Sequence, residues 1–346
     1  MSGFRDIYGH EKTIAHLKSA IVLDQVSHAY LISGDEGMGK KTLARAFAQT
    51  LQCENLQMAV RETGRPAADD PAWKRIDACG LCGSCKQAVS GNQADILTWP
   101  HEKPKLFSVD DARGLVEDIQ IRPFSGRYKI YIVPDAQMMN AQAQNALLKT
   151  LEEPPEYAVL LLLTTNPDAM LETIRSRCVL LDLKPVEDAL VRQYLTEQCD
   201  IPEYEADICE AFAQGNIGKA VSLAASEDFR ETMGRAVRIL THIRDWDLEE
   251  ISAEVKDLVP YKLRIDDLLD LFAVWYRDVL YFKATRELDG IIFREQTSAV
   301  RKAAQESSYE GIQTILDAIR KAKERLNANV NFELTIELLL LTMKEN

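Results

Sequence analysis

The stretch at residues 34–42 combines glycines and lysines at a spacing suited to phosphate chemistry, and its sequence is GDEGMGKKT. Gly34, Gly37 and Gly39 allow the backbone to turn successive N–H groups toward an anion, and Lys40 can reach the terminal phosphates of a nucleotide. An apolar run precedes the stretch and helical spacing follows it, which is the context the motif needs. The stretch predicts a phosphate-binding loop, with ATP or ADP as possible ligands.

The residue after Lys40 bears on metal binding. Loops of this kind have Ser or Thr there, and its hydroxyl ligates Mg²⁺. This chain has Lys41 instead, with Thr42 one position further on, and an ammonium group cannot coordinate a cation. We expect the loop to hold phosphate but to be poorly built for Mg²⁺. The residues of this predicted cofactor site are Gly34, Gly37, Gly39, Lys40, Lys41 and Thr42.

Four cysteines form a second predicted site. Cys79, Cys82 and Cys85 are separated by two residues each, and Cys53 lies upstream. Four thiolates can close a tetrahedral Zn²⁺ shell and leave no position open for a substrate, so the pattern predicts a structural zinc site. The alternative is a loop with three reduced thiols. The segment 54–78 between the first two ligands is long and resembles a surface insertion.

Strands and helices that could position these groups alternate up to about residue 183. Short apolar runs that favour buried strands lie at 29–32, 95–99, 129–133, 158–163 and 179–183. Helical spacing covers 42–51, 109–121 with Ser108 as the N-cap, and 141–151. This alternation predicts a parallel α/β sheet.

After residue 184 the pattern is helical throughout. Two apolar stripes predict helices there, one of them formed by Leu334, Leu338 and Leu341. The other consists of Leu268, Leu271, Trp275, Val279 and Phe282. We therefore expect an α/β domain at 1–183 with the cysteine module inside 53–85, a small helical domain at 184–228 and a second helical domain at 229–346.

Composition limits the classes of partner. The chain has 346 residues, a net charge of −13 and a pI near 5.0, which argues against a surface that binds nucleic acid broadly. No apolar run approaches the roughly 18 residues of a membrane span, and the first residues lack a signal sequence. The seven cysteines, an odd number, favour a reducing compartment. We expect a cytoplasmic protein without a membrane partner.

Several segments in a fixed order resemble one family. They are residues 28–31 (HAYL), the phosphate loop, 79–85 (CGLCGSC), 145–155 (NALLKTLEEPP) and 176–178 (SRC). This series resembles bacterial clamp-loader subunits of the AAA+ class, of the gamma/tau motor type or the delta-prime type. The likeness covers residues 4 to about 225, and the pattern at 326–331 before the last helix is also similar. It implies a P-loop sheet domain, a helical lid domain and a helical collar domain.

The resemblance also assigns positions in the ATPase centre. The motor subunits end one strand in Asp-Glu, which hold Mg²⁺ and polarise the attacking water; here Pro134 and Asp135 stand at those positions. Asp135 is alternatively an ordinary solvated loop residue. Thr165 matches a phosphate-sensing position, and a strand-end turn at Asn166-Pro167 is an equally good explanation of the same residues. Gly218 stands where an Arg of the lid domain is expected, and Lys219, the alternative at this place, lacks the planar fork of arginine. The centre that this predicts is degenerate, without intrinsic catalysis.

Arg177 is the catalytic residue that the resemblance implies. In the family, the Arg of the Ser-Arg-Cys segment reaches the γ-phosphate of ATP bound by the neighbouring subunit, so it acts in trans and its own subunit needs no working ATPase. The alternative is a surface Arg beside a buried Cys178.

The resemblance favours a delta-prime-like subunit that does not hydrolyse ATP itself. Its implied partners are gamma/tau and delta subunits in a hetero-pentamer of the DNA polymerase III holoenzyme, a DNA-directed DNA polymerase. The resemblance also implies the sliding clamp and primer-template DNA as partners within that complex. One alternative is a gamma/tau-type ATP-hydrolysing motor, which the replaced magnesium ligands disfavour. Another is a zinc-dependent DNA-binding module, which the acidic charge and the closed cysteine site disfavour.

Overall fold

The computed structural model describes residues 3–63, 76–99, 106–328 and 330–346, and every structural statement below refers to these residues. The chain separates into two compact units. One consists of residues 1–191 with 215–219, and the other of 192–214 with 220–346. The division into domains at 1–183, 184–228 and 229–346 stays a prediction.

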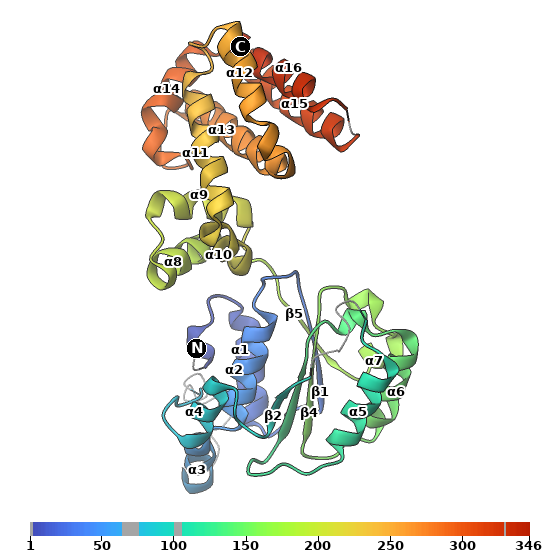
Figure 1. The fold of residues 1–346 in the computed structure, drawn as a ribbon. Coiled ribbons are helices and arrows are strands. Elements are labelled where there is room, and N and C mark those ends of the chain that lie inside the picture. Colours follow the sequence, from blue (N-terminus) through green and yellow to red (C-terminus); the bar gives the residue numbers. More distant parts are fainter. Residues whose placement is uncertain (1–2, 64–75, 100–105, 329) are drawn as a thin grey trace. The chain divides into compact units, whose positions relative to one another are not determined.

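The first unit is built on a parallel sheet. Its five strands lie in the order β2-β3-β4-β1-β5 (Figure 1). They are β1 (Ala29–Ser33), β2 (Ile96–Thr98), β3 (Lys129–Val133), β4 (Ala158–Thr164) and β5 (Val179–Asp182). Every residue of β1, β3 and β4 is buried, because helices cover both faces of the sheet. The predicted parallel α/β sheet is confirmed.

Successive strand residues face opposite cores. Tyr30 and Ile32 pack with Leu43 and Phe47 of α2 (Lys40–Leu51), on the side that also carries α1 (Glu11–Val22). Leu31 packs on the other side, into a core shared with α5 (Val109–Ile119), α6 (Ala141–Glu152) and α7 (Glu172–Arg175). Figure 1 shows the sheet between these two layers.

Local signals set the ends of several elements. Ser108 caps α5 in a capping box with Asp111, as its position predicted. Asn140 caps α6 by accepting the N–H of Ala143. Buried Asp95 accepts N–H groups from residues 124–126, which fixes the turn that leads into β3. These contacts fix the two helix starts and the turn ahead of β3.

The second unit is entirely helical. The division between the units falls inside two helices, at residues 191–192 and 219–220. The helices from residue 188 onward are α8 (Asp188–Cys199), α9 (Glu203–Ala213), α10 (Ile217–Ala225), α11 (Glu227–His242), α12 (Leu248–Asp257), α13 (Ile265–Thr285), α14 (Thr297–Glu306), α15 (Tyr309–Asn327) and α16 (Phe332–Glu345). The predicted stripe that includes Trp275 is buried along α13. In the described residues, no helix is long and apolar enough to cross a membrane.

The predicted apolar stripe on the last helix is not fully buried. Leu334 and Leu338 are about half exposed. The helix α16 instead buries the neighbouring face that carries Ile336, Leu340 and Met343. The unit therefore leaves part of an apolar helix face uncovered.

Candidate functional site

The phosphate loop lies between β1 and α2, as its sequence predicted. Gly37 and Gly39 have φ values of 85° and 84°, and Gly39 is the N-cap of α2. This left-handed backbone favours glycine because a Cβ would be strained there. The loop thus directs the N-terminus of α2 toward the carboxyl edge of the sheet, where an anion would be stabilised.

Lys40 is folded back on its own loop. Its Nζ lies 2.6 Å from the carbonyl oxygen of Gly34 and 2.7 Å from that of Asp35. Burial lowers the pKa of Lys40, against the opposing effect of nearby carboxylates, of which Asp135 is the strongest. The next residue, Lys41, is exposed, and Thr42 is half-buried.

The end of β3 carries no pair of carboxylates. The strand stops at Val133 and is followed by half-buried Pro134 and exposed Asp135, which has a φ of 52° and begins the 3₁₀ turn η3 (Ala136–Met138). At the end of β4, the amide of exposed Thr165 donates to Oε1 of Gln137 at 3.2 Å. The acidic group that follows β3 is therefore Asp135, one residue past Pro134, at the position where the resemblance expects the water-polarising Glu.

A segment from far along the chain lies against the phosphate loop. The amide of Gly218 donates to the carbonyl of Gly37 at 3.0 Å, and Nδ2 of buried Asn216 donates to the carbonyl of Glu36 at 2.7 Å. A Cβ at position 218 would lie 2.5 Å from the Cα and the oxygen of Gly37. Two backbones thus touch where the resemblance expected an arginine side chain. Sequence reasoning missed Asn216, since its partner is a backbone carbonyl 180 residues away.

The four predicted cysteines come together. Their Sγ atoms all lie within 4.8 Å of one another, so Cys53, Cys79, Cys82 and Cys85 could hold a metal ion. Cys53 follows α2, and Cys82 caps α4 (Gly83–Ser90), whose first turn contains buried Cys85. Four sulfur donors in a closed cluster are typical of a structural site rather than a catalytic one.

Backbone amides point at the sulfurs of this cluster. The amides of Leu81 and Cys82 donate to Sγ of Cys79 at 3.4 and 3.3 Å. The amide of Cys85 donates to Sγ of Cys82 at 3.4 Å. Such N–H donors stabilise thiolate, the form of cysteine that binds metals. The cluster is therefore prepared for metal by its own backbone.

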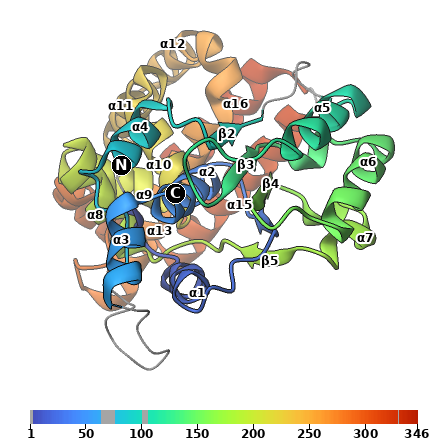
Figure 2. The same ribbon diagram turned by 90° about the horizontal axis from the view of Figure 1, so that it is seen from below.

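The start of the chain supports the cysteine module. Asp77 accepts the amides of Phe4 at 2.8 Å and Arg5 at 3.0 Å, and Arg5 donates to the carbonyl of Ala78 at 2.7 Å. The 3₁₀ turn η1 (Phe4–Asp6) is thus bound two residues ahead of Cys79. Figures 1 and 2 show α4 and α3 (Glu54–Thr63) on the α2 side of the sheet.

Arg177 lies two residues after α7 and just before β5. Its Nη2 is 2.8 Å from Oε1 of Glu152, the last residue of α6, and its Nη1 donates to the carbonyl of Thr173 at 2.9 Å. The Arg177 side chain is 35% exposed. The neighbouring Cys178 is half-buried, and burial raises the pKa of its thiol to about 12.

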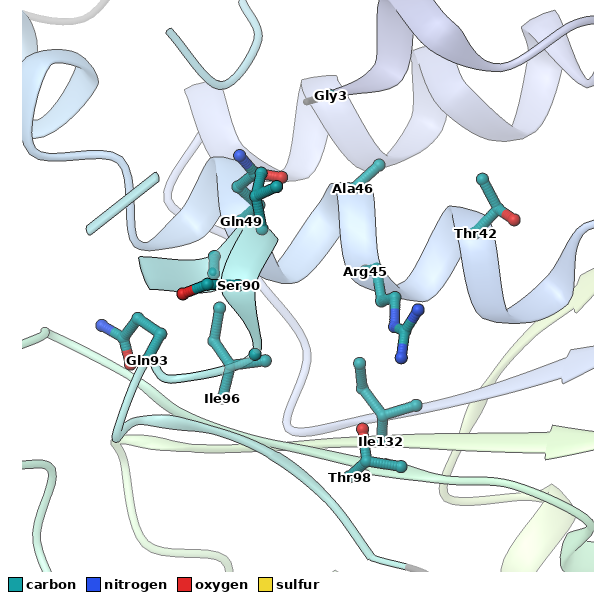
Figure 3. A pocket seen from close by; sticks show the side chains of 13 residues that line it. Gly3, Thr42, Arg45, Ala46, Gln49, Ser90, Gln93, Ile96, Thr98 and Ile132 are labelled. Carbon is teal, nitrogen blue, oxygen red and sulfur yellow. The ribbon is translucent and has the colours of Figure 1, made fainter. Parts of the chain in front are cut away.

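A cavity of about 680 Å³ lies beside the phosphate loop's helix rather than over the loop. It is bounded by α2, by the end of α4 and by β2, and Figure 3 shows Arg45 directed toward Ile132 and Thr98. Of the predicted cofactor residues, it includes Thr42 alone. It therefore lies apart from the phosphate loop and belongs to the junction between the sheet and the cysteine module.

Family models match both units of the chain. The model described as DNA polymerase III, delta subunit, matches residues 9–187. A second, described as DNA polymerase III, delta subunit, C terminal, matches residues 251–345. The chain belongs to the DNA polymerase III delta-subunit family. Membership confirms the expected AAA+ clamp-loader fold class and the connection with DNA replication.

This chain spans nearly the whole length of one relative and only part of two others. It is 28% identical to DNA polymerase III subunit delta' of Bacillus subtilis, over 95% of this chain and 94% of that protein. It is 35% identical to the subunit tau/gamma of Haemophilus influenzae over 64% of this chain, and it spans only 30% of that protein's length. It spans 58% of the tau subunit of Bacillus subtilis, at 25% identity.

Proposed function

We propose that the chain is a delta-prime-type, non-motor subunit of the DNA polymerase III clamp loader. In this role it presents Arg177 to ATP bound by a neighbouring gamma/tau subunit while the sliding clamp is loaded on primed DNA. Gamma/tau and delta subunits complete the hetero-pentamer in the cytoplasm. The B. subtilis delta' relative supports this choice, since the two proteins correspond over nearly their whole lengths.

The contact between Gly218 and Gly37 carries this proposal. A phosphate on the loop would have to share it with a segment that is hydrogen-bonded to the carbonyls of residues 36 and 37. Lys40 Nζ is also committed to two loop carbonyls. Lys41 and Pro134 occupy the two positions at which a motor subunit carries its magnesium-ligating side chains, so both ligands are missing. Each of these features argues against hydrolysis at this loop.

Arg177 suits a role in trans. Arginine offers five N–H donors in a planar fork that matches a phosphate, and it stays charged at any physiological pH. The Arg177 side chain is one-third exposed and lies two residues after a short helix that is anchored by buried Ile174, so the guanidinium is held in place and still accessible to a ligand. Arginine fingers of this type contribute roughly 10³ to 10⁵ in rate.

The cysteine cluster is proposed to bind one structural Zn²⁺ through Cys53, Cys79, Cys82 and Cys85. The donor set, four thiols with two of them buried, fits the closed tetrahedral shell of zinc. Zinc would tie the end of α2 to the start of α4. The same ion thereby supports the helix that begins at the phosphate loop. A role in oligomerisation is proposed for the second unit, whose last helix exposes Leu334 and Leu338.

The proposal is tested by ATPase assays on the reconstituted assembly with clamp and primed DNA. The isolated chain should hydrolyse negligible ATP, and adding it to the motor subunits should raise their rate. Arg177→Ala should abolish that increase. Arg175→Ala is the matched control, because Arg175 lies two residues away with a comparable exposure of 37%. Equal losses from both variants would contradict a specific role of Arg177.

A gamma/tau-type motor is the second candidate, and the 35% identity to the H. influenzae tau/gamma subunit favours it. A motor would hydrolyse ATP in isolation once Mg²⁺ is supplied. Mutation of Lys40 would then abolish the activity of the isolated chain. The first assay therefore separates the two candidates before any assembly is prepared.

A further inference from the structure

We propose that Glu152 restrains Arg177 in the free chain, and that the phosphate of a neighbour's nucleotide replaces this carboxylate on assembly. The proposal rests on the proposed function, since it concerns the same arginine. Glu152 is in this view a positioning residue that acts through Arg177. Glu152 sets the fraction of molecules in which Arg177 is free to contact a phosphate.

The guanidinium is engaged on two sides by its own chain. Nη2 meets Oε1 of Glu152 at 2.8 Å, Nη1 donates to the carbonyl of Thr173 at 2.9 Å, and Nη1 also approaches Oγ of Ser176 at 3.5 Å. The carboxylate is the only charged one of these partners. A phosphate that uses the same pair of N–H edges must displace it.

The two side chains come from elements that are fixed to each other. Gln144 of α6 donates to the carbonyl of Ala169 and accepts the amide of Leu171, at 3.0 and 2.7 Å, which ties α6 to the start of α7. Figures 1 and 2 show α6 and α7 side by side. Release of Arg177 therefore needs a change of side-chain rotamer and no movement of the helices.

The strength of the pair suits a restraint that a ligand can break. The Arg177 and Glu152 side chains are 35% and 50% exposed, so water screens their attraction. Pairs of this exposure shift an equilibrium by up to about fivefold. A nucleotide phosphate carries more charge than a carboxylate and can accept two parallel N–H bonds, whereas Glu152 makes one contact with Nη2, so the phosphate wins the competition. The carboxylate meanwhile prevents Arg177 from pairing with other anions.

The restraint is tested first on the isolated chain, without any partner. The rate at which phenylglyoxal modifies Arg177 is measured by mass spectrometry. Glu152→Gln should raise this rate by about two- to fivefold, the range of a half-exposed pair. Asp168→Asn provides the matched control, since it frees Arg175 from a 3.0 Å ion pair and should raise labelling at Arg175 alone. Unchanged labelling of Arg177 in Glu152→Gln would overturn the proposal.

The second test uses the reconstituted assembly. Glu152→Gln should lower the ATP concentration needed for half-maximal stimulated hydrolysis by the same factor, with the maximal rate kept. Glu153→Gln, which makes the same charge change one residue further on, should have no such effect. A decrease in the maximal rate with Glu152→Gln would overturn the proposal, because it would mean that the carboxylate assists Arg177.

The two tests separate the restraint from the arginine's function. If Glu152→Gln exposes Arg177 to phenylglyoxal while Arg177→Ala leaves the assembly's ATPase unchanged, the restraint stands and the proposed function fails. If Arg177→Ala abolishes stimulation while Glu152→Gln leaves labelling unchanged, the function stands and the restraint fails.

Discussion

The amide of Gly218 donates a hydrogen bond of 3.0 Å to the carbonyl of Gly37, which joins the segment 215–219 to the phosphate loop through their backbones. Gly218→Ala would place a Cβ 2.5 Å from Gly37, so the segment must move away from the loop. We expect a loss of about 1–3 kcal/mol in the local opening free energy of this contact.

Hydrogen exchange measures this loss directly. The amides of residues 34–40 and 215–219 should exchange faster in Gly218→Ala. The control is Gly234→Ala in α11, where a Cβ meets no atom within 4 Å and the helix should gain about 0.5–1 kcal/mol. Unchanged protection of both segments in Gly218→Ala would show that the phosphate loop and residues 215–219 are not held together in solution.

ATP should bind the isolated chain weakly, with an affinity that does not depend on Mg²⁺. Calorimetry with and without the metal should give dissociation constants that differ by less than about threefold, or about 0.6 kcal/mol. The reason is that Lys41 and Pro134 provide no ligand for the cation. Lys40→Ala should remove whatever binding there is. Tight binding that requires Mg²⁺ would instead support the motor candidate.

Zinc should accompany the purified chain at about one equivalent, as a closed four-thiol shell requires. Cys82→Ser should release it, because one missing thiolate opens the shell and Cys82 also caps α4. Amides at 83–90 should then exchange faster. Cys199→Ser, outside the cluster, should keep the metal. A native chain without zinc, measured by elemental analysis, would refute this metal site.

Asp95 should make stability depend on pH in the acidic range. Burial raises its pKa, but the N–H groups of residues 124–126 and the hydroxyl of Ser125 outweigh burial and lower it below its ordinary value. A lowered folded-state pKa means that the stabilisation is present above about pH 4, the unfolded value, and is lost as pH falls toward the folded value.

Asp95→Asn tests this dependence by urea unfolding at several pH values. We expect a loss of about 1–3 kcal/mol at neutral pH, because an amide replaces a buried carboxylate that accepts the backbone N–H groups of residues 124–126. The difference from the native chain should shrink below about pH 4. Asp110→Asn is the control, since the Asp110 side chain is 91% exposed. A pH-independent difference would contradict the assigned role of the Asp95 charge.

Continuous apolar runs made the sheet predictable. The strands at 129–133 and 158–163 are nearly those observed, because a strand covered on both faces is mostly apolar. The apolar stripe on the last helix did not predict burial correctly, because apolar spacing indicates that a face exists but not which elements cover it. Leu334 and Leu338 are on that face and stay half exposed.

The site was predictable where ligands lie close in sequence. Cysteine spacing brought three thiols into the loop before α4 and its first turn, and Cys53 had to come from just after the end of α2. The contacts of Asn216 and Asp77 were not predictable, because both side chains bind backbone groups that tertiary folding brings near them. The Glu152 and Arg177 pair is similar: two exposed charges 25 positions apart carry no sequence pattern until α6 and α7 pack.

The interior position of β1 in the sheet has a consequence for synthesis of the chain. This strand pairs with β4 and β5 alone, and the first of these begins at Ala158, 125 residues after β1 ends at Ser33. At about 5–20 residues per second, the ribosome needs roughly 6 to 25 s to make a partner for it. A largely apolar strand whose edges have no partner yet is prone to aggregate during that interval. We expect nascent chains that end before residue 158 to need a chaperone.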